Sequence, residues 1–207
     1  MKTNSLNLVS ILVASLLLFT SCAKVFYSPD AEAIANKQVN IAIIPPVVSI
    51  AAQKNISHEA IIEQQKAESL NFQKEIYAWL LKRKMQGKIS KEIQVIETTN
   101  AKLNKVGYPE TPHTISELCE ILNVDGVLTS SIGLSKPMSE GAAIATTILL
   151  GFGNTNEVTA TLSINDCQKN KLIWNYEHKL AGGLGSSPST IVDRLMRNAS
   201  KKMPYVN

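Results

Sequence analysis

The 207-residue sequence is poor in cysteine, in aromatic residues and in charge of one dominant sign. Three cysteines are too few for a disulfide framework or a cysteine-rich zinc site. Aromatic residues make up only 5% of the chain, but 44% of it is hydrophobic, which excludes a disordered chain and is typical of a globular domain. The net charge of +4 comes from dispersed basic residues, so we expect no nucleic-acid partner.

The sequence also lacks the motifs of several enzyme classes. It contains no Gly-x-Ser-x-Gly elbow of the hydrolase type. The glycine-rich stretch 182–187 is not followed by the lysine that a phosphate-binding loop requires. None of His58, His113 and His178 has a second histidine or cysteine at zinc-ligand spacing, so we expect ordinary surface or capping histidines. The sequence therefore predicts no catalytic residue, no metal ion and no cofactor.

The amino terminus has the anatomy of a bacterial lipoprotein signal. Residues 8–18 are almost wholly apolar and follow a short polar segment, as in a secretory signal. This run of about eleven residues is too short to cross roughly 30 Å of hydrocarbon. The small residues Thr20 and Ser21 precede Cys22 as in a lipobox, although Phe19 departs from the usual aliphatic residue. We predict that residues 1–21 are removed and that Cys22 carries palmitate and other lipid; the alternative is a plain secretory signal with an incidental cysteine.

The segment after Cys22 has no sustained periodicity, so residues 22–37 are predicted to be a lipidated tether and residues 38–207 a single domain. The two remaining cysteines could pair in an oxidising compartment. Cys119 lies on the apolar side of a helical pattern, whereas Cys167 lies in a turn. Because their contexts differ, we expect two separate thiols.

Within the domain, apolar periodicity and turn residues predict one mixed sheet with helices packed on it, an α/β sandwich of order β-α-β-α-α-β-β-β-α. Thr114 and Glu117 match a capping box, and Asp125-Gly126 leads into a strand. Alternating residues on both sides of 166–170 predict a hairpin whose second strand turns Leu172, Trp174 and Tyr176 inward. The expected strands are 38–47, 93–96, 127–134, 158–164 and 172–180, and the expected helices are 57–86, 98–106, 114–122 and 189–202.

An apolar insert at 141–153 lies between the strands expected at 127–134 and 158–164 and contains no charged residue. It is too short to span a membrane as a helix. One interpretation is a helix buried over the sheet; the other is a surface that meets a partner, a second copy or lipid. The candidate interaction residues are Ile144, Ile148, Leu149, Leu150 and Phe152.

The order of these elements resembles the CsgG/TolB-like superfamily of bacterial lipoproteins. The resemblance covers about Gln38 to Lys202 and is carried by Ile41-Ala42-Ile43-Ile44-Pro45-Pro46, by Asp125-Gly126 before a strand, and by the hairpin with Leu172-Ile173-Trp174. Members include the curli secretion channel lipoprotein, activators of penicillin-binding proteins and the amino-terminal domain of TolB. Curli-type channels have two membrane hairpins, whereas this chain has one apolar insert.

The resemblance implies a periplasmic domain of a Gram-negative bacterium, anchored to the outer membrane through Cys22. It implies a non-enzymatic role in envelope interaction or assembly, with a protein partner or a homo-oligomer. Two alternatives stay open: an oligomeric component of a curli-type secretion channel, and a periplasmic domain that binds a small ligand.

Overall fold

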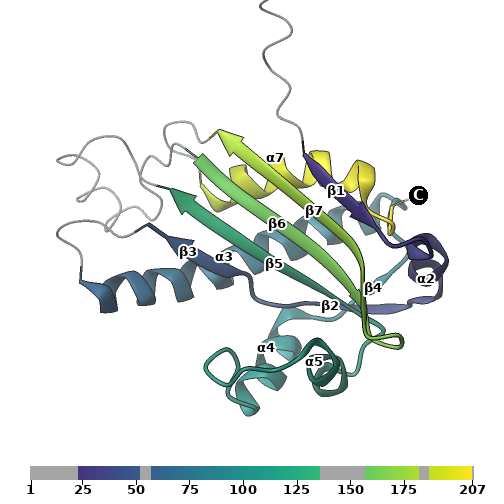
Figure 1. Ribbon diagram of the computed structural model, residues 1–207, viewed down its shortest axis with the longest axis horizontal. Coiled ribbons are helices and arrows are strands. Elements are labelled where there is room, and N and C mark those ends of the chain that lie inside the picture. The colour runs from purple at the N-terminus through teal and green to yellow at the C-terminus, as the bar shows by residue number, and fades with distance from the viewer. Residues whose placement is uncertain (1–22, 52–56, 136–156, 182–186, 207) are drawn as a thin grey trace, which may run out of the picture.

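Seven strands form one mixed sheet in the computed structural model, which describes residues 23–51, 57–135, 157–181 and 187–206. The strand order is β1-β7-β6-β5-β2-β4, and β3 pairs with β5 beyond the end of β2 (Figure 1). The strands are β1 (Lys24–Tyr27), β2 (Asn40–Ile43), β3 (Val47–Ile50), β4 (Glu92–Ile93), β5 (Gly126–Ser135), β6 (Glu157–Asp166) and β7 (Lys171–Ala181). The predicted α/β class, with helices packed on a single mixed sheet, is confirmed.

Helices lie on both faces of the sheet but cover them unequally. The long helix α3 (His58–Met85) and the C-terminal α7 (Pro188–Ala199) pack on one face, behind the sheet in Figure 1, and η1 (Ser200–Lys202) follows α7. The shorter α4 (Ile96–Lys105) and α5 (Ile115–Leu122) cover the other face only where β2 and β5 begin. The helix α2 (Ala31–Lys37) lies beside the β6–β7 turn.

Local signals in the sequence explain where the helices begin and end. The Ser57 hydroxyl accepts a hydrogen bond from the Ala60 N–H at 3.2 Å, and α3 ends before Gly87, whose φ of +69° suits glycine. The predicted capping box of α5 is present, with Thr114 and Glu117 bonding each other's backbone.

The main core lies between the sheet and the pair α3 and α7. Its largest fully buried side chains include Trp174 and Tyr176, whose rings stack with centroids 5.8 Å apart. The inward phase predicted for Leu172 is wrong, because that side chain is 37% exposed. A bulge explains the difference: Ile164 pairs with Trp174 but Asn165 pairs with Leu172, so one extra residue of β7 shifts the alternation.

The predicted tether is largely part of the fold. Residues 24–27 form β1, which pairs antiparallel with β7, and residues 31–37 form α2. Val25 packs against the core and Ile34 and Ala35 are buried, so apolar burial holds this segment in place. A four-residue strand and a seven-residue helix are too short to produce a visible periodicity in sequence.

The first predicted strand, 38–47, is shorter than expected, and a strand that was not predicted follows it. Pro45 and Pro46 separate β2 from β3, and the register advances by four residues from Ile43 to Val47 while β5 advances by three. The extra residue is a bulge at a position where proline cannot donate to the ladder. Further along, β4 is only two residues long and Ile96 already begins α4, so the strand expected over 93–96 is shorter than predicted.

Candidate interaction surfaces

The predicted site residues lie outside the described part of the chain. Cys22 precedes the first described residue, and Ile144, Ile148, Leu149, Leu150 and Phe152 fall within 136–156. Their predicted roles therefore stay predictions. The described residues do fix the points from which the chain leaves toward these segments.

Those points gather at one end of the sheet. The last residue of β5, Ser135, pairs with the first residue of β6, Glu157, which also pairs with Ala181 at the end of β7. Lys24 pairs with Glu177, and β1 runs antiparallel to β7, so β1 begins on the side of this same end (Figure 1). The lipobox-like sequence and the apolar insert are thus both joined to the fold at this end.

One face of the central strands has no described helix over it (Figure 1). Small hydroxyl and amide side chains alternate there with the buried residues, and Glu177 and Lys179 are among its few charges. Phe26 of β1 is 49% exposed beside them, in register with Asn175. An antiparallel sheet commonly presents one such face to water. The hydroxyl side chains on this uncovered face of the central strands are Thr129, Ser131, Thr159, Thr161 and Ser163.

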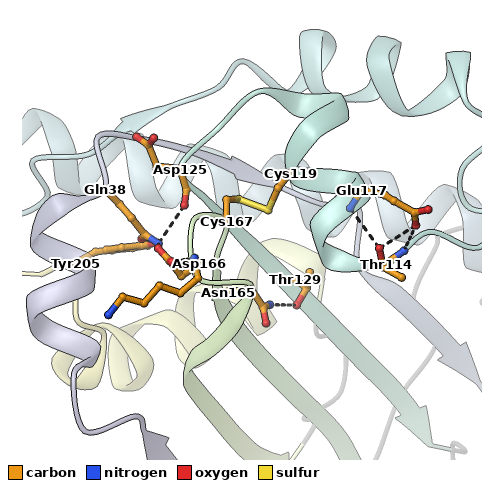
Figure 2. The surroundings of a disulfide bond; sticks show 11 residues. Gln38, Thr114, Glu117, Cys119, Asp125, Thr129, Asn165, Asp166, Cys167 and Tyr205 are labelled. Carbon is orange, nitrogen blue, oxygen red and sulfur yellow. Dashed lines mark hydrogen bonds between the residues drawn. A yellow bond between two sulfur atoms is a disulfide. The ribbon is translucent and has the colours of Figure 1, made fainter.

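A buried polar cluster lies at the opposite end of the sheet, beside the β6–β7 turn. Gln38 Nε2 donates to Asp166 Oδ1 at 2.7 Å and to the Asp125 carbonyl at 3.2 Å, while the Tyr205 hydroxyl donates to Gln38 Oε1 (Figure 2). The buried Lys91 ammonium donates to the Gln38 carbonyl at 2.8 Å. Because every one of these groups has a partner within the chain, the cluster joins separate segments rather than offering open ligand positions.

The two aspartates of this cluster also bind backbone amides. Asp125 Oδ2 accepts from the N–H groups of Val39 and Asn40, both at 2.8 Å, and Asp166 Oδ2 accepts from the Lys169 N–H at 2.7 Å. Asp125 thereby fixes the entry of β2 beside β5. The Asp125-Gly126 pair noted in the sequence has this structural role.

Burial and charge shift several pKa values around the cluster. Burial raises the pKa of Tyr205 far above its ordinary value, and Asp166 and Asp125 add to the effect. Burial lowers the pKa of Lys91, although Asp125 opposes the shift. The Asp30 carboxyl forms ion pairs with the ammonium groups of Lys171 and Lys169, and these two positive charges lower its pKa. The two shifts for Tyr205 and Asp30 leave the phenol neutral and the carboxyl ionised at neutral pH.

Cys119 and Cys167 form a disulfide, so the expectation of two separate thiols is wrong (Figure 2). Their Cα atoms are 5.5 Å apart although 48 residues separate them in sequence. The fold brings the apolar side of α5 against the β6–β7 turn, where the Cys167 N–H donates to the Asp125 carbonyl at 3.0 Å. The sequence neighbourhoods of the two cysteines gave no sign that the fold brings them together.

A cavity of about 620 Å³ adjoins the disulfide. Residues from α2, α5 and the β6–β7 turn line it, including Lys37, Glu120 and Gln168. Two of its carboxylates, Asp125 and Asp166, are already occupied by hydrogen bonds within the chain. Among the residues placed by the structure, no group of three or more histidine, cysteine, aspartate or glutamate side chains could hold a metal ion.

The three histidines have different environments, and the prediction of ordinary surface or capping positions is wrong for His178. This residue is buried on β7 beside Tyr176, with ring centroids 5.9 Å apart, and its Nδ1 has no hydrogen-bond partner among the residues that the structure describes. Burial lowers its pKa below the ordinary value, and the positive charges of Arg194 and Lys202 lower it further. The ring is therefore neutral at neutral pH.

Comparison with known proteins identifies no family for the chain. No family model matches the sequence, and no curated protein matches it at a significant level. Solved structures to which the chain is similar include lipoprotein GNA1162 from Neisseria meningitidis, at 13% identity and a TM-score of 0.46, covering 79% of this chain and 95% of that one. Others are the PelC dodecamer from Paraburkholderia phytofirmans (10%, TM-score 0.40, covering 89% and 98%) and the LpoB C-terminal domain from Salmonella enterica (10%, TM-score 0.36, covering 73% and 95%). At these TM-scores the likeness does not identify what this chain binds or does.

Proposed function

We propose that this chain is a membrane-anchored periplasmic lipoprotein that serves as a non-enzymatic interaction or assembly component of the cell envelope. The observation that carries the proposal is the common end of the sheet from which both Cys22 and the apolar insert depart. Lipid on Cys22 brings this end to the outer membrane. The uncharged insert is then positioned to meet the lipid surface or a neighbouring protein there.

The disulfide supports the proposed compartment. Disulfides persist in the oxidising bacterial periplasm and are rare in the cytosol. The Cys119–Cys167 bond is therefore consistent with export by the N-terminal signal. Within the described ranges, no helix has both the length and the apolar character to cross a membrane. The proposed attachment is through lipid on Cys22, and two or three acyl chains anchor a protein stably.

The first experiment tests the anchor by cell fractionation. We expect Cys22→Ala to release the protein from membranes or to leave an uncleaved precursor. Ser10→Ala is the matched control, because it changes a residue of the same signal and leaves Cys22 and the disulfide intact. A processed Cys22→Ala protein that still requires detergent for extraction contradicts the anchor.

The second experiment tests the insert with the double substitution Ile148→Ser and Leu150→Ser. We expect the thermal unfolding midpoint to stay unchanged while cross-linked neighbours or oligomers in native envelopes are lost. Leu172→Ser, at the opposite end of the sheet, is the control and should retain them. A double variant that unfolds shows instead that the insert belongs to the core, and the proposed interaction role of the insert then fails.

A further inference from the structure

Two basic segments that are far apart in the sequence lie side by side in the fold. Residues 82–91 contain five basic residues and residues 194–206 contain four, and neither segment contains an acidic residue. α3 packs against α7, and an antiparallel bridge between Ile89 and Val206 joins the chain that follows α3 to the chain that follows η1. Basic residues that are dispersed in the sequence are therefore concentrated around the C-terminal ends of these two helices.

The outer side of α7 and η1 carries an exposed part of this basic region. Arg194, Arg197 and Lys201 are spaced by three and four residues, so they lie on one side of the helix, opposite its buried residues, and Lys202 follows them. All four side chains are exposed, and the one acidic residue of α7, Asp193, forms an ion pair with Arg197 at 2.7 Å. We call these four basic residues the basic face.

The charges of the basic face are only partly balanced by the chain itself. Within the described ranges, the ammonium groups of Lys201 and Lys202 have no ion-pair partner. The dipole of a helix favours basic residues in its last turn, but only Arg197 of the basic face lies in the last turn of α7. The basic face therefore has unbalanced positive charge that suits an anionic partner.

The basic face lies beside the start of β1. The Tyr27 hydroxyl of β1 donates to the Lys202 carbonyl. Arg194 and Lys202 are both close enough to His178 for their positive charges to act on its ring. His178 in turn follows, on β7, the residue that pairs with the first residue of β1. In Figure 1, α7 accordingly passes behind the start of β1, where the chain leads back toward Cys22.

We propose that the basic face binds the anionic phospholipid headgroups of the membrane to which Cys22 attaches the chain. This inference rests on the proposed function, because Cys22 lies only two positions before Lys24, the first residue of β1, and its lipid would hold the basic face near the bilayer. Each basic side chain near an anionic bilayer favours binding by about fivefold. The Tyr27 ring beside Lys202 is 48% exposed, and tyrosine is favoured at the headgroup level of a membrane.

The test measures how fast single lysines of the full chain are acetylated on vesicles. The chain is reconstituted from detergent into vesicles of phosphatidylcholine, or of phosphatidylcholine and phosphatidylglycerol in equal parts. The uncharged reagent N-hydroxysuccinimidyl acetate is added, and mass spectrometry gives the rate at each lysine. We expect Lys201 and Lys202 to react several-fold more slowly on the anionic vesicles, and high salt should remove the difference. Equal rates on the two kinds of vesicle overturn the proposal.

Two exposed lysines on other parts of the fold serve as controls in the same sample. Lys37 ends α2 and Lys105 ends α4, and neither helix contributes to the basic face. Their rates should be the same on both kinds of vesicle. Slowing of all four lysines alike indicates a general effect of the anionic surface on the reagent, and it overturns binding through the basic face.

A pair of matched variants tests the contribution of a single charge. Lys201→Gln should reduce the protection of Lys202 on anionic vesicles by about fivefold, whereas Lys105→Gln should leave it unchanged. Both lysines are exposed, and circular dichroism checks that both variants stay folded. Equal protection of Lys202 in the two variants overturns the proposal.

Flotation of the unsubstituted chain separates this proposal from the lipid anchor. A chain that floats with phosphatidylcholine vesicles, but whose lysines react equally on both kinds, retains the anchor and contradicts the basic face. A chain that floats only with anionic vesicles, with Lys201 and Lys202 protected, supports the basic face and contradicts the anchor. A chain that floats with neither kind contradicts both.

Discussion

Removal of the Cys119–Cys167 disulfide should destabilise the domain strongly, because this bond closes a long loop. Replacing both cysteines with alanine removes a constraint on residues 48 apart in the chain. For a loop of this length, the chain-entropy relation gives about 4 kcal/mol at 25 °C. Measured values for disulfides are typically about 2–4 kcal/mol, so we expect a loss of free energy of unfolding within that range.

The assay is urea unfolding of residues 23–207, which contain every described strand and helix. Tryptophan fluorescence monitors the unfolding. The unsubstituted protein is measured with and without reductant, beside the double variant. We expect the reduced protein and the double variant to share a lower midpoint, and the oxidised protein to unfold at higher urea. Equal midpoints for the oxidised and reduced protein would refute the reasoning, since the bond would then be absent or without effect on the unfolded ensemble. The double variant should show no reductant dependence.

Three further predictions concern the core and the polar cluster. Trp174→Ala should cost about 3–5 kcal/mol in thermal or urea unfolding, whereas Leu172→Ala, at a partly exposed position, should cost far less; equal costs would mean that the bulge is misplaced. The unfolded state takes up a proton on His178 at a higher pH than the folded state, so stability should be full above pH 6.5 and fall as the pH drops below it. His178→Phe should flatten that part of the stability profile, and an unchanged slope would exclude this histidine as its source. Gly126→Ala should lower the melting temperature, because the new Cβ would lie 2.9 Å from both Gln38 Oε1 and the Tyr205 hydroxyl oxygen. An unchanged melting temperature would show that the buried polar cluster can move to make room for a methyl group.

Local signals predicted most of the fold correctly. The helix expected over 57–86, the capping box at Thr114 and the β6–β7 hairpin each depend on residues a few positions apart, and all three are present. Short elements were missed for the same reason, since β1 and β3 owe their strand conformation to pairing with β7 and β5 rather than to a pattern of their own.

The polar features could not be predicted because they join distant segments. Gln38, Asp166 and Tyr205 meet only after the sheet has formed, and nothing in their sequence neighbourhoods distinguishes them from surface residues. The disulfide has the same origin, because it requires α5 to pack against the β6–β7 turn. The lipobox-like motif differs from these features, since its pattern is local, and the prediction for Cys22 stands on that pattern alone.

The pairing of β1 with β7 has a consequence for how the domain is held at a surface. A tether running to residue 37 could extend about 50 Å. Because β1 begins at Lys24, only two or three residues connect Cys22 to the sheet, and they extend about 7–10 Å. With Cys22 lipidated as proposed, the sheet cannot tumble freely or stand away from the bilayer. The end of the sheet at which β1 begins would therefore stay close to the bilayer surface. A partner then meets this domain by lateral diffusion and from a narrow range of directions, which lowers the orientational cost of each encounter.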